Sequence, residues 1–102
     1  MASSADYLDY VIDLLADVPE VTSRRMMGEY LLYASGKLFG GIYDNRFLVK
    51  DTPATHKVLS TTEVPYKGAS PMLLVDIENN EVVADMVAAM LPELPEPKER
   101  KR

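Results

Sequence analysis

The sequence predicts an α+β domain, a two-layer sandwich in which helices cover one face of a five-stranded antiparallel sheet. Three observations lead to this fold class. The chain has 102 residues, a length that suits one compact core. Apolar residues recur with helical spacing near both ends, whereas residues 29–50 change to the spacing of strands. Short turn sequences separate the strand-like segments, which favours antiparallel neighbours. The expected element order is α-β-β-β-α-β-β-α.

The first half of the chain is expected to form one helix and three strands. The helix covers residues 4–17, with Ser3 as its N-cap, and ends before Pro19 because proline cannot continue it. Its two faces differ in character, one carrying Leu8, Val11, Ile12 and Leu15 and the other carrying Asp6, Asp9, Asp13 and Asp17. Strands are expected at 29–33, 37–43 and 46–50, joined by tight turns.

The second half is expected to add a short helix over 53–59, a hairpin with strands at 63–67 and 72–77, and a last helix from about residue 80 to Pro92. Residues 1–95 would form the domain, and residues 96–102 a disordered basic tail. With helices on one face of the sheet, the other face is expected to meet solvent, a partner or a second copy of the chain.

Composition excludes several classes of protein. The net charge is −5, and the chain without its last seven residues carries −7, which repels a phosphate backbone. Any contact with DNA is therefore expected to be weak or indirect. The absence of cysteine excludes disulfides, cysteine-based zinc sites and thiol nucleophiles. Apolar runs of four or five residues cannot span a membrane, and the N-terminus lacks the pattern of a signal peptide, so a cytoplasmic location is expected.

No motif predicts catalysis, a metal or a cofactor. The aspartates of the first helix diverge along a convex surface, whereas a hard cation needs converging oxygens. His56 has neither a readable nucleophile nor an orienting partner. Gly40-Gly41 is flanked by strands and more often marks a bulge or a close backbone approach than a phosphate loop. The methionines, Met26, Met27, Met86 and Met90, are expected to fill the core.

Basic residues gather in the meander, interleaved with tyrosines. Outside the tail, five of the seven basic residues are Arg24, Arg25, Lys37, Arg46 and Lys50. Such a mixture suits contact with an acidic protein surface or with nucleic acid. The plainer alternative is a solvated sheet face with cross-strand charge pairs.

The same segment carries a family resemblance. The run Val21-Thr22-Ser23-Arg24-Arg25-Met26-Met27-Gly28-Glu29-Tyr30-Leu31-Leu32-Tyr33, with the later Asp44-to-Lys50 stretch, resembles the N-terminal domain of the TfoX/Sxy family of bacterial competence regulators. The likeness covers about residues 3–91. Two positions depart from the family pattern, since Met27 and Glu29 stand where phenylalanine and glycine are usual.

The resemblance implies a stand-alone, non-enzymatic module that acts by protein–protein contact in transcription regulation. Its implied partner is the cyclic-AMP receptor protein or another transcription component. The residues expected to contact that partner are Arg24, Arg25, Gly28, Tyr30, Lys37 and Lys50. The alternative function is a small-molecule or peptide-binding domain that uses a groove between the helices and the sheet. Direct DNA binding through the tail and meander ranks third, and an enzyme last.

Overall fold

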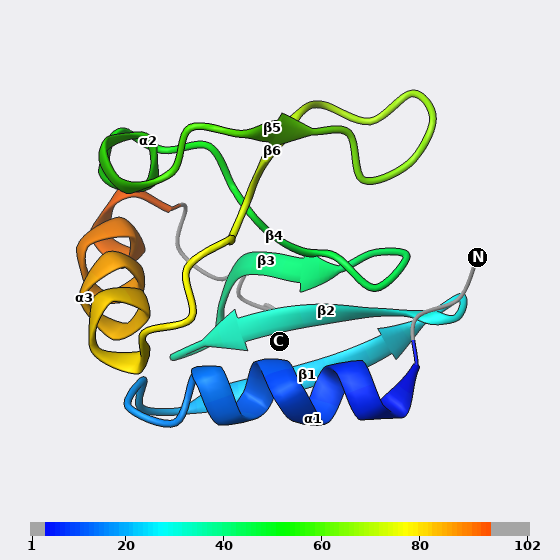
Figure 1. Ribbon diagram of the computed structural model, residues 1–102, viewed down its shortest axis with the longest axis horizontal. Coiled ribbons are helices and arrows are strands. Elements are labelled where there is room, and N and C mark those ends of the chain that lie inside the picture. The colour runs from blue at the N-terminus through cyan, green and yellow to red at the C-terminus, as the bar shows by residue number, and fades with distance from the viewer. Residues whose placement is uncertain (1–3, 95–102) are drawn as a thin grey trace, which may run out of the picture.

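The computed structural model describes residues 4–94 as an antiparallel sheet packed against helices (Figure 1). The elements are α1 (Ala5–Leu14), β1 (Val21–Met26), β2 (Glu29–Ala34), β3 (Lys37–Ile42), β4 (Phe47–Val49), α2 (Pro53–Val58), β5 (Thr62–Glu63), β6 (Met72–Leu74), α3 (Asn80–Met90) and the 3-10 turn η1 (Leu91–Glu93). The strand order across the sheet is β1-β2-β3-β4-β6-β5. The predicted α+β class and antiparallel sheet are therefore confirmed, while the expected basic tail lies outside the described residues.

The sheet has six strands instead of the five predicted. The additional strand is β1, which pairs with β2 in a register that runs from Val21 opposite Ala34 to Met26 opposite Glu29. All of its residues except Val21 are exposed, so β1 lacks the alternation of buried and exposed positions that identifies a strand. The observed order is α-β-β-β-β-α-β-β-α. The last two strands are also shorter than predicted.

Side-chain caps fix where the helices begin. Ser4 caps α1, its hydroxyl oxygen accepting the Tyr7 N–H at 3.1 Å, in place of the predicted Ser3. Thr52 and Thr55 bond reciprocally at the start of α2, which forms a capping box. Asn79 caps α3 through the Val82 N–H at 3.0 Å. Each cap satisfies a backbone donor that would otherwise lack a helical partner.

The hydrophobic core lies between the helices and one face of the sheet. Along β2, Tyr30, Leu32 and Ala34 are buried and alternate with half-buried residues that point to the opposite face. The core cluster joins these side chains to α1, α3 and the inner strands; its fully buried members include Val11, Leu32, Phe39, Ile42, Val49, Leu73, Val87 and Met90. Leu48 has 0% exposure but lies outside this cluster, because its strand position faces the other side of the sheet.

The glycine pair in β3 has the structural role predicted for it. The pairing of β2 with β3 shifts register between Leu32 and Tyr33, which marks a bulge. A Cβ on Gly40 would lie 2.3 Å from the carbonyl oxygen of Leu48, so a side chain there would force β3 and β4 apart. At Gly41 a Cβ would lie 2.8 Å from the ring of Tyr43. The missing side chain at Gly41 thus makes room for that ring.

Candidate functional site

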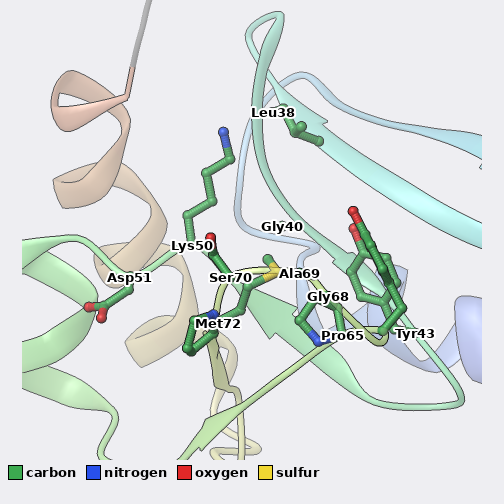
Figure 2. A pocket seen from close by; sticks show the side chains of 12 residues that line it. Leu38, Gly40, Tyr43, Lys50, Asp51, Pro65, Gly68, Ala69, Ser70 and Met72 are labelled. Atoms are coloured by element: carbon green, nitrogen blue, oxygen red, sulfur yellow. The ribbon is translucent and has the colours of Figure 1, made fainter.

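The sheet face that points away from the helices carries two hollows. We call this surface the open face. One hollow, the tip hollow, has a volume of about 480 Å³ and is lined by Met26, Met27, Glu29, Leu31, Tyr43, Pro65 and Tyr66. The other, the Lys50 hollow, has a volume of about 670 Å³ and is lined by Leu38, Gly40, Tyr43, Lys50, Asp51, Pro65, Tyr66, Gly68, Ala69, Ser70, Pro71 and Met72 (Figure 2).

A pair of tyrosines is common to both hollows. The ring centroids of Tyr43 and Tyr66 lie 6.1 Å apart, and their planes are inclined by 55°. Burial raises the pKa of the Tyr43 hydroxyl, and the nearby Tyr66, Glu29 and Tyr33 raise it further. The Tyr43 hydroxyl therefore keeps its proton, and its ability to donate a hydrogen bond, to a higher pH than an ordinary tyrosine does.

Arg46 holds the two segments that carry these tyrosines together. Its Nε donates to the carbonyl oxygen of Tyr43 at 3.1 Å, and its Nη1 donates to Oε1 of Glu63 at 2.6 Å. Its Nη2 donates to the carbonyl oxygens of Val64 and Pro65 at 3.4 and 3.3 Å. One guanidinium thus bridges the β3–β4 turn to the chain after β5, which fixes the spacing of the aromatic pair.

The β1–β2 turn projects an apolar side chain into solvent. Met27 has a backbone φ of 53° and Gly28 a φ of 84°, as a two-residue turn of a right-twisted hairpin requires. The Met27 side chain is 95% exposed, and Met26 is 50% exposed. Met86 and Met90 lie in the core as predicted, but the expectation of core positions for Met26 and Met27 is wrong. Their positions at the end of an edge strand and in its turn leave nothing to cover them.

Glu29, one of the two departures from the family pattern, stabilises a neighbouring turn. Its carboxylate accepts the backbone N–H of Asp44 at 3.2 and 3.3 Å. Asp44 and Asn45 both have positive φ, at 55° and 56°, so this is the tight turn between β3 and β4. The carboxylate thus satisfies a donor at the turn.

The six residues predicted to contact a partner do not share one surface. Arg24 and Arg25 are exposed neighbours on β1 and therefore point to opposite faces of the sheet. Within residues 4–94 their side chains make no hydrogen bond or ion pair. Gly28 lies in the β1–β2 turn, and Lys50 lines the Lys50 hollow.

The other two predicted residues are held by the fold. Tyr30 is only 8% exposed because β2 directs its ring into the core, so it offers no anchor to a partner in this structure. Lys37 donates from Nζ to the carbonyl oxygen of Leu91 at 2.9 Å. Sequence reasoning missed the roles of Met27, Tyr43 and Tyr66 on the open face. The signal available for Met27 was its place in a two-residue turn.

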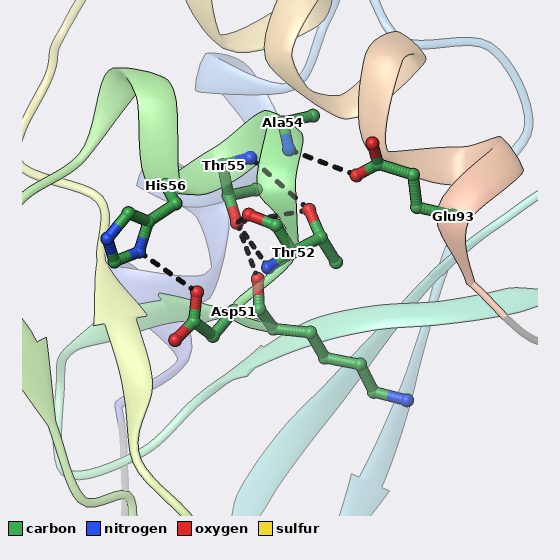
Figure 3. Close-up of polar contacts among 7 residues, drawn as sticks. Asp51, Thr52, Ala54, Thr55, His56 and Glu93 are labelled. Carbon is green, nitrogen blue, oxygen red and sulfur yellow. Dashed lines mark hydrogen bonds and ion pairs between the residues drawn. The ribbon is translucent and has the colours of Figure 1, made fainter.

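The polar cluster at the start of α2 is structural in its contacts (Figure 3). Nδ1 of His56 lies 3.2 Å from Oδ1 of Asp51, and both side chains are largely exposed. The Thr55 hydroxyl is buried and donates to the carbonyl oxygen of Lys50 at 2.8 Å. Activation of a hydroxyl nucleophile would need a hydrogen bond between that hydroxyl and the His56 ring. Among residues 4–94, no hydroxyl makes such a bond. The same residues contain no group of three or more side chains placed to hold a metal ion.

The groove predicted between the helices and the sheet is filled by core side chains, and the two large hollows lie on the opposite face. Across residues 4–94, no helix combines the length and apolar character needed to cross a membrane. The fold and site together define a small α+β domain with an open, partly apolar sheet face and no assembled catalytic set in the described residues.

Comparison with known proteins places this domain in a family. The profile of the TfoX N-terminal domain matches residues 13–75, more than half of the chain, and the chain belongs to this family. It is also 35% identical over 105 residues to an uncharacterised 12.7 kDa protein in the trpE 5′ region of Spirochaeta aurantia. That alignment covers 99% of this chain and 91% of the relative. The resemblance seen in the meander is thus confirmed, and the family is not known for enzymatic activity.

Proposed function

We propose that this protein is a non-enzymatic regulatory module that acts in bacterial transcription through protein–protein contact. Membership of the TfoX N-terminal family supports the regulatory class. The observation that carries the mode of action is Met27, a large apolar side chain that is 95% exposed on a left-handed backbone. The two-residue turn requires this backbone conformation, and it holds an apolar side chain in solvent, where a partner can cover it.

The proposed contact surface is the tip of the β1–β2 hairpin: Arg24, Met26, Met27 and Leu31 on the side of the open face, and Arg25 on the other face of the same edge strand. Apolar side chains beside arginines are typical of interface centres, where methionine and arginine are enriched. Arg24 and Leu31 are cross-strand partners and so share the open face with Met26. The surface therefore combines an apolar centre with a cation at its border.

β1 supplies a second recognition element along its free edge. It is the terminal strand of the sheet, and its residues 22–26 are exposed, so the backbone groups on its outer edge face solvent. An extended partner segment adds to such an edge through main-chain hydrogen bonds. The two arginines would select an acidic segment, since neither is neutralised by a bond within residues 4–94.

Reversal of the charges at Arg24 and Arg25 tests the proposal. Fluorescence anisotropy of a labelled promoter fragment would report assembly with the cyclic-AMP receptor protein, with and without this chain. The expected result is that the wild-type chain changes the anisotropy only when the receptor protein is present, and that R24E/R25E abolishes the change. The substituted positions are exposed and unbonded within the described part of the chain, so the melting temperature should move by less than about 2 °C.

The matched control is K57E, which reverses one exposed charge on α2, compared with R24E alone. The two substitutions alter the net charge equally, but only Arg24 lies on the proposed surface. R24E should therefore weaken assembly, and K57E should not. Equal losses for the two variants would show that net charge, not the tip, determines assembly. Retention of full assembly by R24E/R25E would contradict the proposed surface.

A further inference from the structure

We propose that the Lys50 hollow binds a small aromatic carboxylate, with Lys50 pairing to the carboxylate and the tyrosines packing against the ring. This site lies across the open face from the hairpin tip, and its occupant is a small molecule instead of a protein. The hollow has a volume of about 670 Å³, within the range of roughly 300–1,000 Å³ that is usual for small-ligand sites.

Lys50 supplies an uncompensated cation at one side of the hollow. Its side chain is half-buried, and within residues 4–94 its ammonium group makes no hydrogen bond or ion pair. The nearest carboxylate along the chain, that of Asp51, is paired with His56 at 3.2 Å. Figure 2 shows the Asp51 carboxylate directed to the other side of the chain, while the Lys50 stem runs past Ser70 toward Leu38. Asp51 lines the same hollow, but its carboxylate lies against His56 and points away from Lys50, so the ammonium group stays open to a ligand anion.

The remaining walls suit a flat apolar body with a polar edge. Tyr43 faces Lys50 across the hollow, and Leu38, Pro65 and Met72 add apolar surface (Figure 2). A planar ring packs well against tyrosine rings in an offset or tilted arrangement, and methionine adapts to its outline. The hydroxyl groups of Tyr43 and Ser70 add polar partners for the edge of the ligand. The hollow thus offers both apolar surface for a ring and polar groups for its edge.

The groups that form the hollow are held in place before any ligand arrives. The Lys50 N–H donates to the carbonyl oxygen of Phe39 at 2.9 Å, and the Lys50 carbonyl oxygen accepts the buried Thr55 hydroxyl at 2.8 Å. On the opposite wall, Arg46 ties the turn that follows Tyr43 to the chain at Pro65. A site whose walls are already fixed loses less conformational entropy on binding.

The test is an amide NMR titration of the full chain with 2-naphthoate as the probe. Two comparison probes separate the parts of the ligand: 2-naphthalenemethanol has the ring without the charge, and inorganic phosphate has the charge without the ring. We expect saturable binding of 2-naphthoate with a Kd of about 1 mM, the affinity that a small fragment reaches in a good site. The shifted amides should be those around Lys50 and residues 68–72. The neutral alcohol and phosphate should each bind at least about tenfold more weakly.

The variants K50Q and K57Q complete the test. Lys57 is an exposed lysine on α2 that does not line the hollow, so K57Q controls for the loss of one positive charge. K50Q should weaken 2-naphthoate by about tenfold, and K57Q by less than about twofold. Equal affinity for K50Q and the wild type, or shifts confined to the hairpin tip, would overturn the assignment. Stronger binding of phosphate than of 2-naphthoate would overturn the aromatic part of it. None of these readouts depends on the receptor protein or on promoter DNA.

Discussion

Replacement of Arg46 by methionine (R46M) removes four hydrogen bonds: one within the β3–β4 turn and three that join this turn to residues 63–65. Methionine keeps much of the apolar stem, so the change isolates the guanidinium. The bond to Glu63 is short and charge-assisted, but the two side chains are 28% and 35% exposed, which lowers its value to about 1 kcal/mol. The bond to the Tyr43 carbonyl contributes about 1 kcal/mol, and the two contacts at 3.3 and 3.4 Å together add less than about 1 kcal/mol.

R46M should therefore lower the free energy of unfolding by about 2–3 kcal/mol, or the melting temperature by roughly 10 °C in a domain of this size. Urea unfolding followed by circular dichroism measures the change. E63Q keeps the backbone bonds of Arg46 and should cost only about 1 kcal/mol, so the double variant should cost little more than R46M alone. A loss below about 0.5 kcal/mol in R46M, or strict additivity with E63Q, would refute the role given to Arg46.

Two further predictions concern the backbone of the sheet and the half-buried phenol of Tyr43 on the open face. G40A should destabilise the domain by about 3 kcal/mol, because its Cβ would lie 2.3 Å from the Leu48 carbonyl oxygen. The Cβ of G68A would meet nothing within 4 Å, so that variant should cost only about 1 kcal/mol, for its positive φ. Similar melting temperatures for the two variants would contradict the close approach of β3 and β4. The raised pKa of Tyr43 means that the unfolded chain loses this proton first, so stability is retained below the ordinary value of 10.0 and falls as the pH rises above it. Y43F should reduce this alkaline loss, and ultraviolet titration of tyrosinate should lose one of the components that titrate above the ordinary value of 10.0 in that variant.

Much of the fold could be predicted because local signals and tertiary packing agree. The apolar stripes of α1 and α3 have helical spacing, and most of their side chains pack in the core, but Ile12 of the predicted α1 stripe and Val82 of α3 are exposed. The turn at Asp44 and Asn45 was predicted from two residues that tolerate positive φ, and both adopt it. β1 was missed because an edge strand without a buried face carries no alternation, and only its pairing with β2 defines it.

The candidate site was less accessible to sequence reasoning. The basic residues of the meander could be identified from the sequence. The face of the sheet to which Arg24 and Arg25 point depends on the register between β1 and β2, and that register could not be predicted while β1 itself was not recognised as a strand. Tyr30 and Tyr43 each follow a glycine by two residues, yet the first is buried in the core and the second lies over Gly41 on the open face. The joining of Tyr66 to Tyr43 depends on Arg46 and is a tertiary contact that no local pattern encodes.

Hydrogen exchange of the β1 amides on mixing with the cyclic-AMP receptor protein tests the central proposal most directly. The strand is exposed at residues 22–26, so its outward amides should exchange rapidly in the free chain. If the partner adds to this edge, those amides and the amide of Met27 should become protected, and R24E/R25E should abolish the protection. Unchanged exchange along β1 in a mixture that assembles on promoter DNA would contradict the proposed contact surface.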